Sequence, residues 1–259
     1  MTAQKYMADG IEVWCLQDGT KSFDPEVFPA ADATTIAARL ADAGLTSIET
    51  AFNAYMLRHP DGAVDLVDAG CGARFGPAAG LLPARLKALG VTPADVRNLI
   101  FTHLHGDHCG GAVLDGKAAY PNARVFVHAK EIGHYDANEA AGEMLSAYAG
   151  RITEIDDDTV LPGNLRVWGL PGHAPGHLGL WVGDNFALVG DILHSFALQL
   201  PDPDLCPIYD HDPALATQTR KAALEHLADN GVVWSGSHGI GARFVRVERA
   251  EQGFRTLPA

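Results

Sequence analysis

Residues 102–111 read THLHGDHCGG and place three histidines and one aspartate within six residues. Neutral imidazole nitrogen binds Zn, Fe, Mn or Co, and carboxylate oxygen suits the harder of these cations. Because alternate residues of a loop point the same way, His103 and His105 can share one metal ion, while Asp107 and His108 turn toward a second. The glycines of the stretch let the backbone bend tightly. This stretch therefore predicts a metal site.

Three later motifs each offer a further ligand. Residues 171–177 read PGHAPGH and contain His173, residues 189–191 end in Asp191, and residues 236–238 end in His238. Each of these motifs follows a short apolar stretch that is typical of a strand. Loops at the carboxyl ends of strands carry function in layered α/β folds, so we expect these residues to meet. His177 is an alternative to His173, although a supporting role is favoured for it.

The rest of the chain predicts short strands that alternate with helices. Strands are expected at 10–16, 53–58, 63–68, 98–102, 124–127, 165–170, 178–182, 186–189 and 232–234, and helices at 81–89, 129–135, 139–150 and 217–228. Residues 21–35 are interpreted as a loop or lid, and 199–213 as a loop. Turn residues at 61–62 and 183–185 predict two hairpins. The sequence shows no repeat or long linker, which favours one α/β domain over residues 1–259.

Composition narrows the possible partners. The chain has 259 residues, 47% of them hydrophobic, and a net charge of −13. Such an acidic chain disfavours nucleic acid and anionic membranes as partners, but its charge says nothing positive about a substrate. The predicted metal site indicates a small-molecule substrate. No apolar run is long enough to span a bilayer, and the first ten residues lack the apolar core of a secretory signal. Four cysteines without a CxxC pair favour a reducing compartment, so a cytoplasmic location is expected.

The quoted stretch resembles the His-x-His-x-Asp-His motif of the metallo-β-lactamase superfamily, and the later motifs follow in that superfamily's order. The resemblance covers residues 50 to 240 and implies an αββα sandwich of two mixed β-sheets flanked by helices. It also implies two divalent metal ions, with zinc favoured over Mn, Fe or Co. The implied ligands are His103, His105 and His173 for one ion, Asp107, His108 and His238 for the other, and Asp191 as the bridge.

Within the superfamily, three stretches are similar to methyl parathion hydrolases and quorum-quenching lactonases. They are DAGCG (68–72) with FGP (75–77), LKALGVTPADV (86–96), and GDILH (190–194) with PDPD (201–204). The resemblance implies hydrolysis of a lactone or ester by a metal-bridging hydroxide. We predict that Asp107 or a metal-bound water protonates the leaving group. A phosphotriesterase is the alternative, and a homodimer is possible.

One position departs from the acyl-homoserine lactonases, which carry Tyr three residues after the bridging Asp. This chain has His194 there, and an imidazole can act as a donor or acid. We predict a catalytic role for His194, with a passive place in the pocket wall as the alternative. Since no Lys or Arg adjoins the motifs, a neutral lactone or ester is favoured over a phosphate monoester.

Two other functions stay open on the same fold. One is a mono-iron sulfur oxygenase, and the other is a non-catalytic metal-binding module, which the complete ligand set disfavours. The substrate pocket is expected to be apolar. Its candidate residues are Phe23, Phe28, Met56, Phe75, Tyr135, Phe196, Leu198, Leu200 and Ile208. Cys109 is interpreted as a buried packing residue, and His59, His134, His211 and His226 as solvated or pocket-edge histidines.

Overall fold

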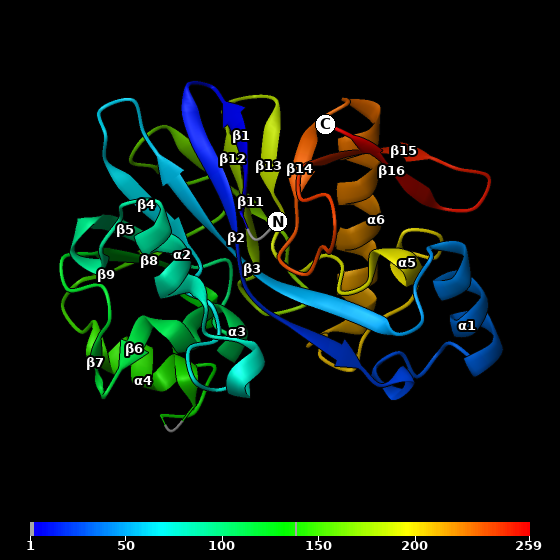
Figure 1. Cartoon of the computed structure of the whole chain (residues 1–259), viewed down its shortest axis with the longest axis horizontal. Helices are drawn as coiled ribbons and strands as arrows, with labels where there is room; N and C mark the ends of the chain where they lie inside the picture. Colours follow the sequence, from blue (N-terminus) through cyan, green and yellow to red (C-terminus); the bar gives the residue numbers. More distant parts are fainter. Residues whose placement is uncertain (1–2, 138) are drawn as a thin grey trace.

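A computed structural model describes residues 3–137 and 139–259, which form two seven-stranded β-sheets and flanking helices (Figure 1). The first sheet has the order β1-β2-β3-β4-β5-β8-β9, with bounds Ala3–Ala8, Ile11–Phe23, Ile48–Arg58, Val64–Val67, Val96–Ile100, Arg124–His128 and Ile152–Ile155. The second runs from β10 to β16, with bounds Val160–Leu161, Leu165–Gly169, Leu178–Val182, Phe186–Leu188, Val233–Ser235, Val245–Arg249 and Phe254–Pro258. Strands β6 (Val113–Leu114) and β7 (Lys117–Ala118) form a separate small hairpin.

Helices cover the outer faces of both sheets. They are α1 (Ala33–Asp42), α2 (Leu82–Ala88), α3 (Gly106–Cys109), α4 (Ala140–Ala147), α5 (Phe196–Gln199) and α6 (Pro213–Asp229). In Figure 1, α4 lies at the lower left of the molecule and α6 on the right. Each sheet mixes parallel and antiparallel pairs: β4 and β5 are parallel in the first sheet, as are β13 and β14 in the second. The expected αββα sandwich is confirmed.

Three apolar clusters hold the layers together. The central cluster joins the inner faces of the sheets, with Tyr55 and Ile100 from the first and Leu180 and Leu188 from the second. A second cluster packs the first sheet against α2 and α4, and a third packs the second sheet against α6. Burial of apolar surface on both faces of each sheet explains why the strands are so uniformly apolar.

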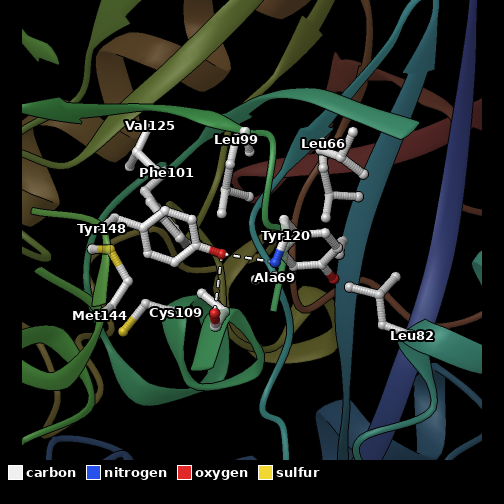
Figure 2. Close-up of a cluster of buried hydrophobic side chains, with 14 of the residues drawn as sticks. Leu66, Ala69, Leu82, Leu99, Phe101, Cys109, Tyr120, Val125, Met144 and Tyr148 are labelled. Atoms are coloured by element: carbon white, nitrogen blue, oxygen red, sulfur yellow. Dashed lines mark hydrogen bonds between the residues drawn. The ribbon is translucent and has the colours of Figure 1, made fainter. Parts of the chain in front are cut away.

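The second of these clusters anchors the histidine-rich loop from behind (Figure 2). Phe101, Leu104 and Cys109 are all buried in it, so the apolar residues of the motif face the core while the polar ones face away. The hydroxyl of Tyr148 accepts the backbone N–H of Tyr120 at 3.0 Å and donates to a backbone carbonyl at 3.1 Å, as Figure 2 shows. Because the side chain of Cys109 is fully buried in this apolar cluster, Cys109 is a packing residue, as expected.

Both predicted hairpins and most predicted strands are confirmed, but two expectations are wrong. Residues 21–35 are a loop only in their middle part: β2 continues to Phe23, α1 begins at Ala33, and Phe28 between them is fully buried against α1. The helix predicted at 129–135 is only a short 3-10 turn, Ala129–Glu131. The Glu131 carboxylate accepts the N–H groups of Leu104 and Gly176, so it ties the chain to two loops instead of continuing a helix.

Strand β2 contains a bulge that matters for the site. Gln17 pairs with Asn53 but Gly19 pairs with Phe52, so the register slips at Asp18. The buried Asp18 carboxylate accepts three backbone N–H groups, from Cys71, Gly80 and Leu82. A one-residue slip moves every later side chain to the opposite face of the sheet. The side chains of Lys21 and Phe23, near the end of β2, therefore project from the same face of the sheet as Phe52.

Nowhere in the described part of the chain is there a helix with the length and apolar character that a membrane crossing requires.

Candidate metal centre

The predicted ligands gather at one edge of the sandwich, and each follows a strand. His103 and His105 lie after β5, with Asp107 and His108 in the short helix α3. The other three come from the second sheet. They are His173 after β11, Asp191 after β13 and His238 after β14. The site is thus assembled half from each sheet, and the structure brings all seven predicted side chains together.

Three imidazoles form the first group. The Nδ1 atom of His105 lies 3.0 Å from Nε2 of His103 and 3.0 Å from Nε2 of His173. Three ring nitrogens that converge in this way present their lone pairs to one point, which is the arrangement of a three-histidine metal site.

The second group consists of Asp107, His108, Asp191 and His238. The Oδ2 atom of Asp191 lies 3.2 Å from Nε2 of His108 and 2.7 Å from Nε2 of His238. The same oxygen lies 3.4 Å from Nε2 of His173, which belongs to the first group. Asp191 therefore lies close to nitrogens of both groups, as the prediction of a bridging residue requires.

Each of four predicted ligand histidines is oriented through its other ring nitrogen. His108 Nδ1 donates to Asp68 at 2.8 Å, and His173 Nδ1 donates to Asp210 at 2.9 Å. His238 Nδ1 donates to the Ala51 carbonyl at 2.9 Å. His103 Nδ1 lies 3.1 Å from the Thr102 hydroxyl, which in turn donates to Asp68. These bonds leave each Nε2 free to act as a ligand.

Electrostatics divides the histidines into two sets. Burial lowers the pKa of His103 well below its usual value, and burial with the neighbouring His173 lowers the pKa of His105 to about 3. Burial also lowers the pKa of His108, but the carboxylates of Asp191, Asp107 and Asp68 outweigh it and raise the pKa well above normal. The pKa of His238 is raised in the same way, since Asp191 outweighs burial.

The residues present fit a pair of metal ions. Among the buried side-chain atoms that lack any hydrogen-bond partner are His108 Nε2 and Asp191 Oδ1. Buried polar atoms are rarely left unpaired, because the loss of water then costs free energy without compensation. Both atoms belong to residues of the cluster, and nitrogen with carboxylate oxygen is a donor set that divalent Zn, Mn, Fe or Co accepts.

Two other histidines at the centre have different surroundings. His177 Nε2 accepts the N–H of Asp191 at 2.9 Å and its Nδ1 donates to the Leu170 carbonyl, so both nitrogens are used. The supporting role favoured for His177 is consistent with this geometry. His194 Nε2 lies 3.5 Å from Asp191 Oδ2, and its buried Nδ1 has no partner. Burial lowers the pKa of His194 well below its usual value.

His59 is not solvated, although it lines a pocket away from the cluster. This residue is buried at 6% exposure, and its Nε2 lies 2.8 Å from a carboxylate oxygen of the fully buried Asp65. The turn that carries His59 follows β3, so its ring folds back onto β4 instead of projecting into solvent.

A cavity of about 370 Å³ opens over the cluster. Of the apolar candidates, only Phe23 and Phe75 line it, whereas Phe28, Met56, Leu198 and Leu200 are buried in the core. Two aromatic residues that sequence reasoning missed, Phe52 and Tyr209, also line the cavity, and so does Lys21. Only the bulge in β2 turns Lys21 toward the site, and spacing in the sequence does not show this.

Known proteins are similar to this chain in sequence and in fold. The family model of the metallo-beta-lactamase superfamily matches residues 50–235. The N-acyl homoserine lactonase AttM of Azorhizobium caulinodans is 31% identical over 192 residues, which cover 67% of this chain and 58% of AttM. The N-acyl homoserine lactonase AiiA of Bacillus thuringiensis subsp. kurstaki is 32% identical over 147 residues, covering 54% of each chain. The chain therefore belongs to the metallo-β-lactamase superfamily, as its motifs predict.

Solved structures share the whole fold. The crystal structure of hydrolase AbOPH, in the beta lactamase superfamily, has a TM-score of 0.91 at 25% identity and covers 100% of this chain and 97% of that one. AidC, a dizinc quorum-quenching lactonase, has a TM-score of 0.90 at 23% identity, and the match covers 99% of this chain and 97% of AidC. By contrast, the matched part of this chain spans about half the length of the curated relatives.

Proposed function

We propose that this protein is a dinuclear-metal hydrolase of lactones or esters. The observation that carries the proposal is the position of Asp191 Oδ2, within 3.4 Å of ring nitrogens from both ligand groups. His103, His105 and His173 would hold one ion, Asp107, His108 and His238 the other, and Asp191 both. Two bound divalent cations supply a hydroxide nucleophile at neutral pH and withdraw electron density from a carbonyl oxygen.

Asp107 and His194 would handle protons and charge around the substrate. Both line the cavity, and Asp107 Oδ2 lies 3.6–3.7 Å from the ring nitrogens of His108 and His238. An Asp107 carboxyl that gains a proton during attack can pass it to the leaving oxygen. His194 is neutral at neutral pH because its pKa is lowered, so it offers an N–H to a developing oxyanion instead of an easily lost proton.

The substrate class is proposed from two sources. The matched relatives AttM and AiiA are named N-acyl homoserine lactonases, and an aromatic cavity suits an acyl or aryl group. The ligand set includes the bridging position that a mono-iron or purely metal-binding protein does not need. A phosphotriester remains the alternative substrate for the same site.

The test is metal content together with hydrolysis before and after chelation. We expect close to two metal ions per chain and chelator-sensitive hydrolysis of substrates from a panel of lactones, p-nitrophenyl esters and methyl parathion. Asp191→Asn should lose most activity and metal, because its amide replaces the bridging charge. One iron per chain, no hydrolysis by the metal-loaded protein, or full activity with intact metal in Asp191→Asn would contradict the proposal.

A further inference from the structure

The wall of the cavity is a ring of aromatic side chains with one gap, between Phe75 and Phe23. Ring centroids are 5.9 Å apart for His238 and Phe52, 5.2 Å for Phe52 and Phe75, and 5.8 Å for Phe23 and Tyr209. Tyr209 lies 6.1 Å from His194, which stacks on His238 at 4.7 Å. The ring thus begins and ends on His238, beside the ligand cluster.

Lys21 closes the one gap in this ring. Its Nζ lies 5.7 Å from the ring centroid of Phe23 and 6.0 Å from that of Phe75. It is the single Lys or Arg that lines the cavity in the described part of the chain. The bulge at Asp18 produces this placement, because it puts Lys21 and Phe23 on the same face as Phe52.

The ammonium group of Lys21 has no carboxylate to neutralise it. Lys5 and Lys221 each pair with a carboxylate within 3.0 Å, whereas none of the ion pairs or side-chain hydrogen bonds among residues 3–137 and 139–259 involves Lys21. Contact with aromatic faces stabilises an exposed cation only weakly. The three donors of the ammonium group are therefore available to a ligand in the cavity.

We infer that Lys21 is a specificity-determining residue that binds an anionic group, a carboxylate above all, on the part of the substrate remote from the scissile bond. This inference rests on the proposed function and deepens it. The reacting lactone or ester stays neutral, while the exposed ammonium group of Lys21 donates charge-assisted hydrogen bonds to the anion. No Lys or Arg adjoins the motifs in the sequence, but the fold brings Lys21 to the cavity.

The test compares esters that differ only in a terminal carboxylate. Mono-p-nitrophenyl esters of dicarboxylic acids, from glutarate to suberate, are measured against p-nitrophenyl alkanoates of the same carbon number. A second pair, 4-carboxyphenyl butyrate and phenyl butyrate, places the anion on the leaving group. We expect at least one anionic ester to be preferred, and Lys21→Met to raise its KM about tenfold while the neutral partner changes little.

Two control variants isolate the charge. Lys21→Arg keeps the cation and should keep most of the preference, whereas Lys117→Met removes an exposed lysine of β7 that does not line the cavity and should change nothing. Calorimetry with the matching anilides, in which an amide replaces the ester, should show the same dependence on Lys21 in binding alone.

The outcomes separate the two proposals. If the wild type hydrolyses none of these esters and none of the lactones, the proposed function fails. If it hydrolyses them but Lys21→Met leaves every anionic-to-neutral ratio unchanged, the function stands and the role of Lys21 is overturned.

Discussion

The same residue type does three different jobs in this protein, and the neighbours of each ring decide which. His103 has its Nδ1 held by Thr102, so its Nε2 is free for a metal ion. Both nitrogens of His177 are taken by the backbone, which makes it a support for Asp191. His59 pairs with Asp65 far along the sheet from the cluster. An imidazole is thus a ligand only where one nitrogen is left unpaired and aimed at other donors.

Metal binding at His108 and His238 should depend on pH. His108 and His238 have raised pKa values in the metal-free protein, since Asp191 stabilises their protonated forms more than burial destabilises them. A metal ion binds only the neutral ring, so metal binding must release these protons. We expect affinity to rise with pH below the raised pKa values, by about tenfold per pH unit for each proton displaced.

The measurement is the metal dissociation constant, obtained by chelator competition at pH 6, 7 and 8. Calorimetry in two buffers of different ionisation enthalpy counts the protons released. A dissociation constant that does not vary with pH, with no buffer dependence of the heat, would contradict the assignment of His108 and His238 as ligands.

Helix α6 supports the loops of the candidate metal centre through the side chain of Arg220. Arg220, fully buried in α6, donates to Asp210 at 3.0 Å, and its other N–H groups reach the carbonyls of Ile192 and Pro203. Asp210 in turn accepts from His173 Nδ1. Since Ile192 directly follows Asp191, one buried guanidinium steadies two loops that carry predicted ligands.

Asp210→Asn should therefore weaken metal binding about 10- to 100-fold, because the amide orients and polarises His173 less than a carboxylate does. The dissociation constant is measured by chelator competition, and circular dichroism checks that the variant is folded. Asp204→Asn is the matched control. Asp204 lies in the same loop but pairs with Lys221 at the surface, where an ion pair contributes little. Equal affinity in the folded Asp210 variant would exclude this positioning role.

At the scale of the whole molecule, the ligand cluster ties the two halves of the sandwich together. Four of the predicted ligands follow β5 in the first sheet and three follow strands of the second. Ions bound there would hold the native arrangement and would have no equivalent site in the unfolded chain.

One domain over residues 1–259, the homodimer and the cytoplasmic location all stay predictions.

Removal of metal should accordingly lower the melting temperature. A metal concentration about 100 times the dissociation constant stabilises the folded state by about 2.7 kcal/mol, or roughly 5–10 °C for a chain of this size. Differential scanning calorimetry with and without chelator measures the shift, and one cooperative transition is expected if the chain is one domain. Asp191→Asn, which should bind little metal, is the control and should not respond. An unchanged midpoint in the wild type, or two separate transitions, would count against this account.

The sequence by itself determined the superfamily, the sandwich and the candidate ligands, because short motifs of fixed spacing carry both the backbone turns and the donor atoms. The residues that surround the candidate ligands became visible only in the tertiary structure. Lys21, Phe52 and Tyr209 reach the cavity, and Asp210 reaches His173, through contacts between segments far apart in the chain. A single bulge at Asp18 reverses the face on which the end of β2 projects, and nothing in local spacing reveals such a slip.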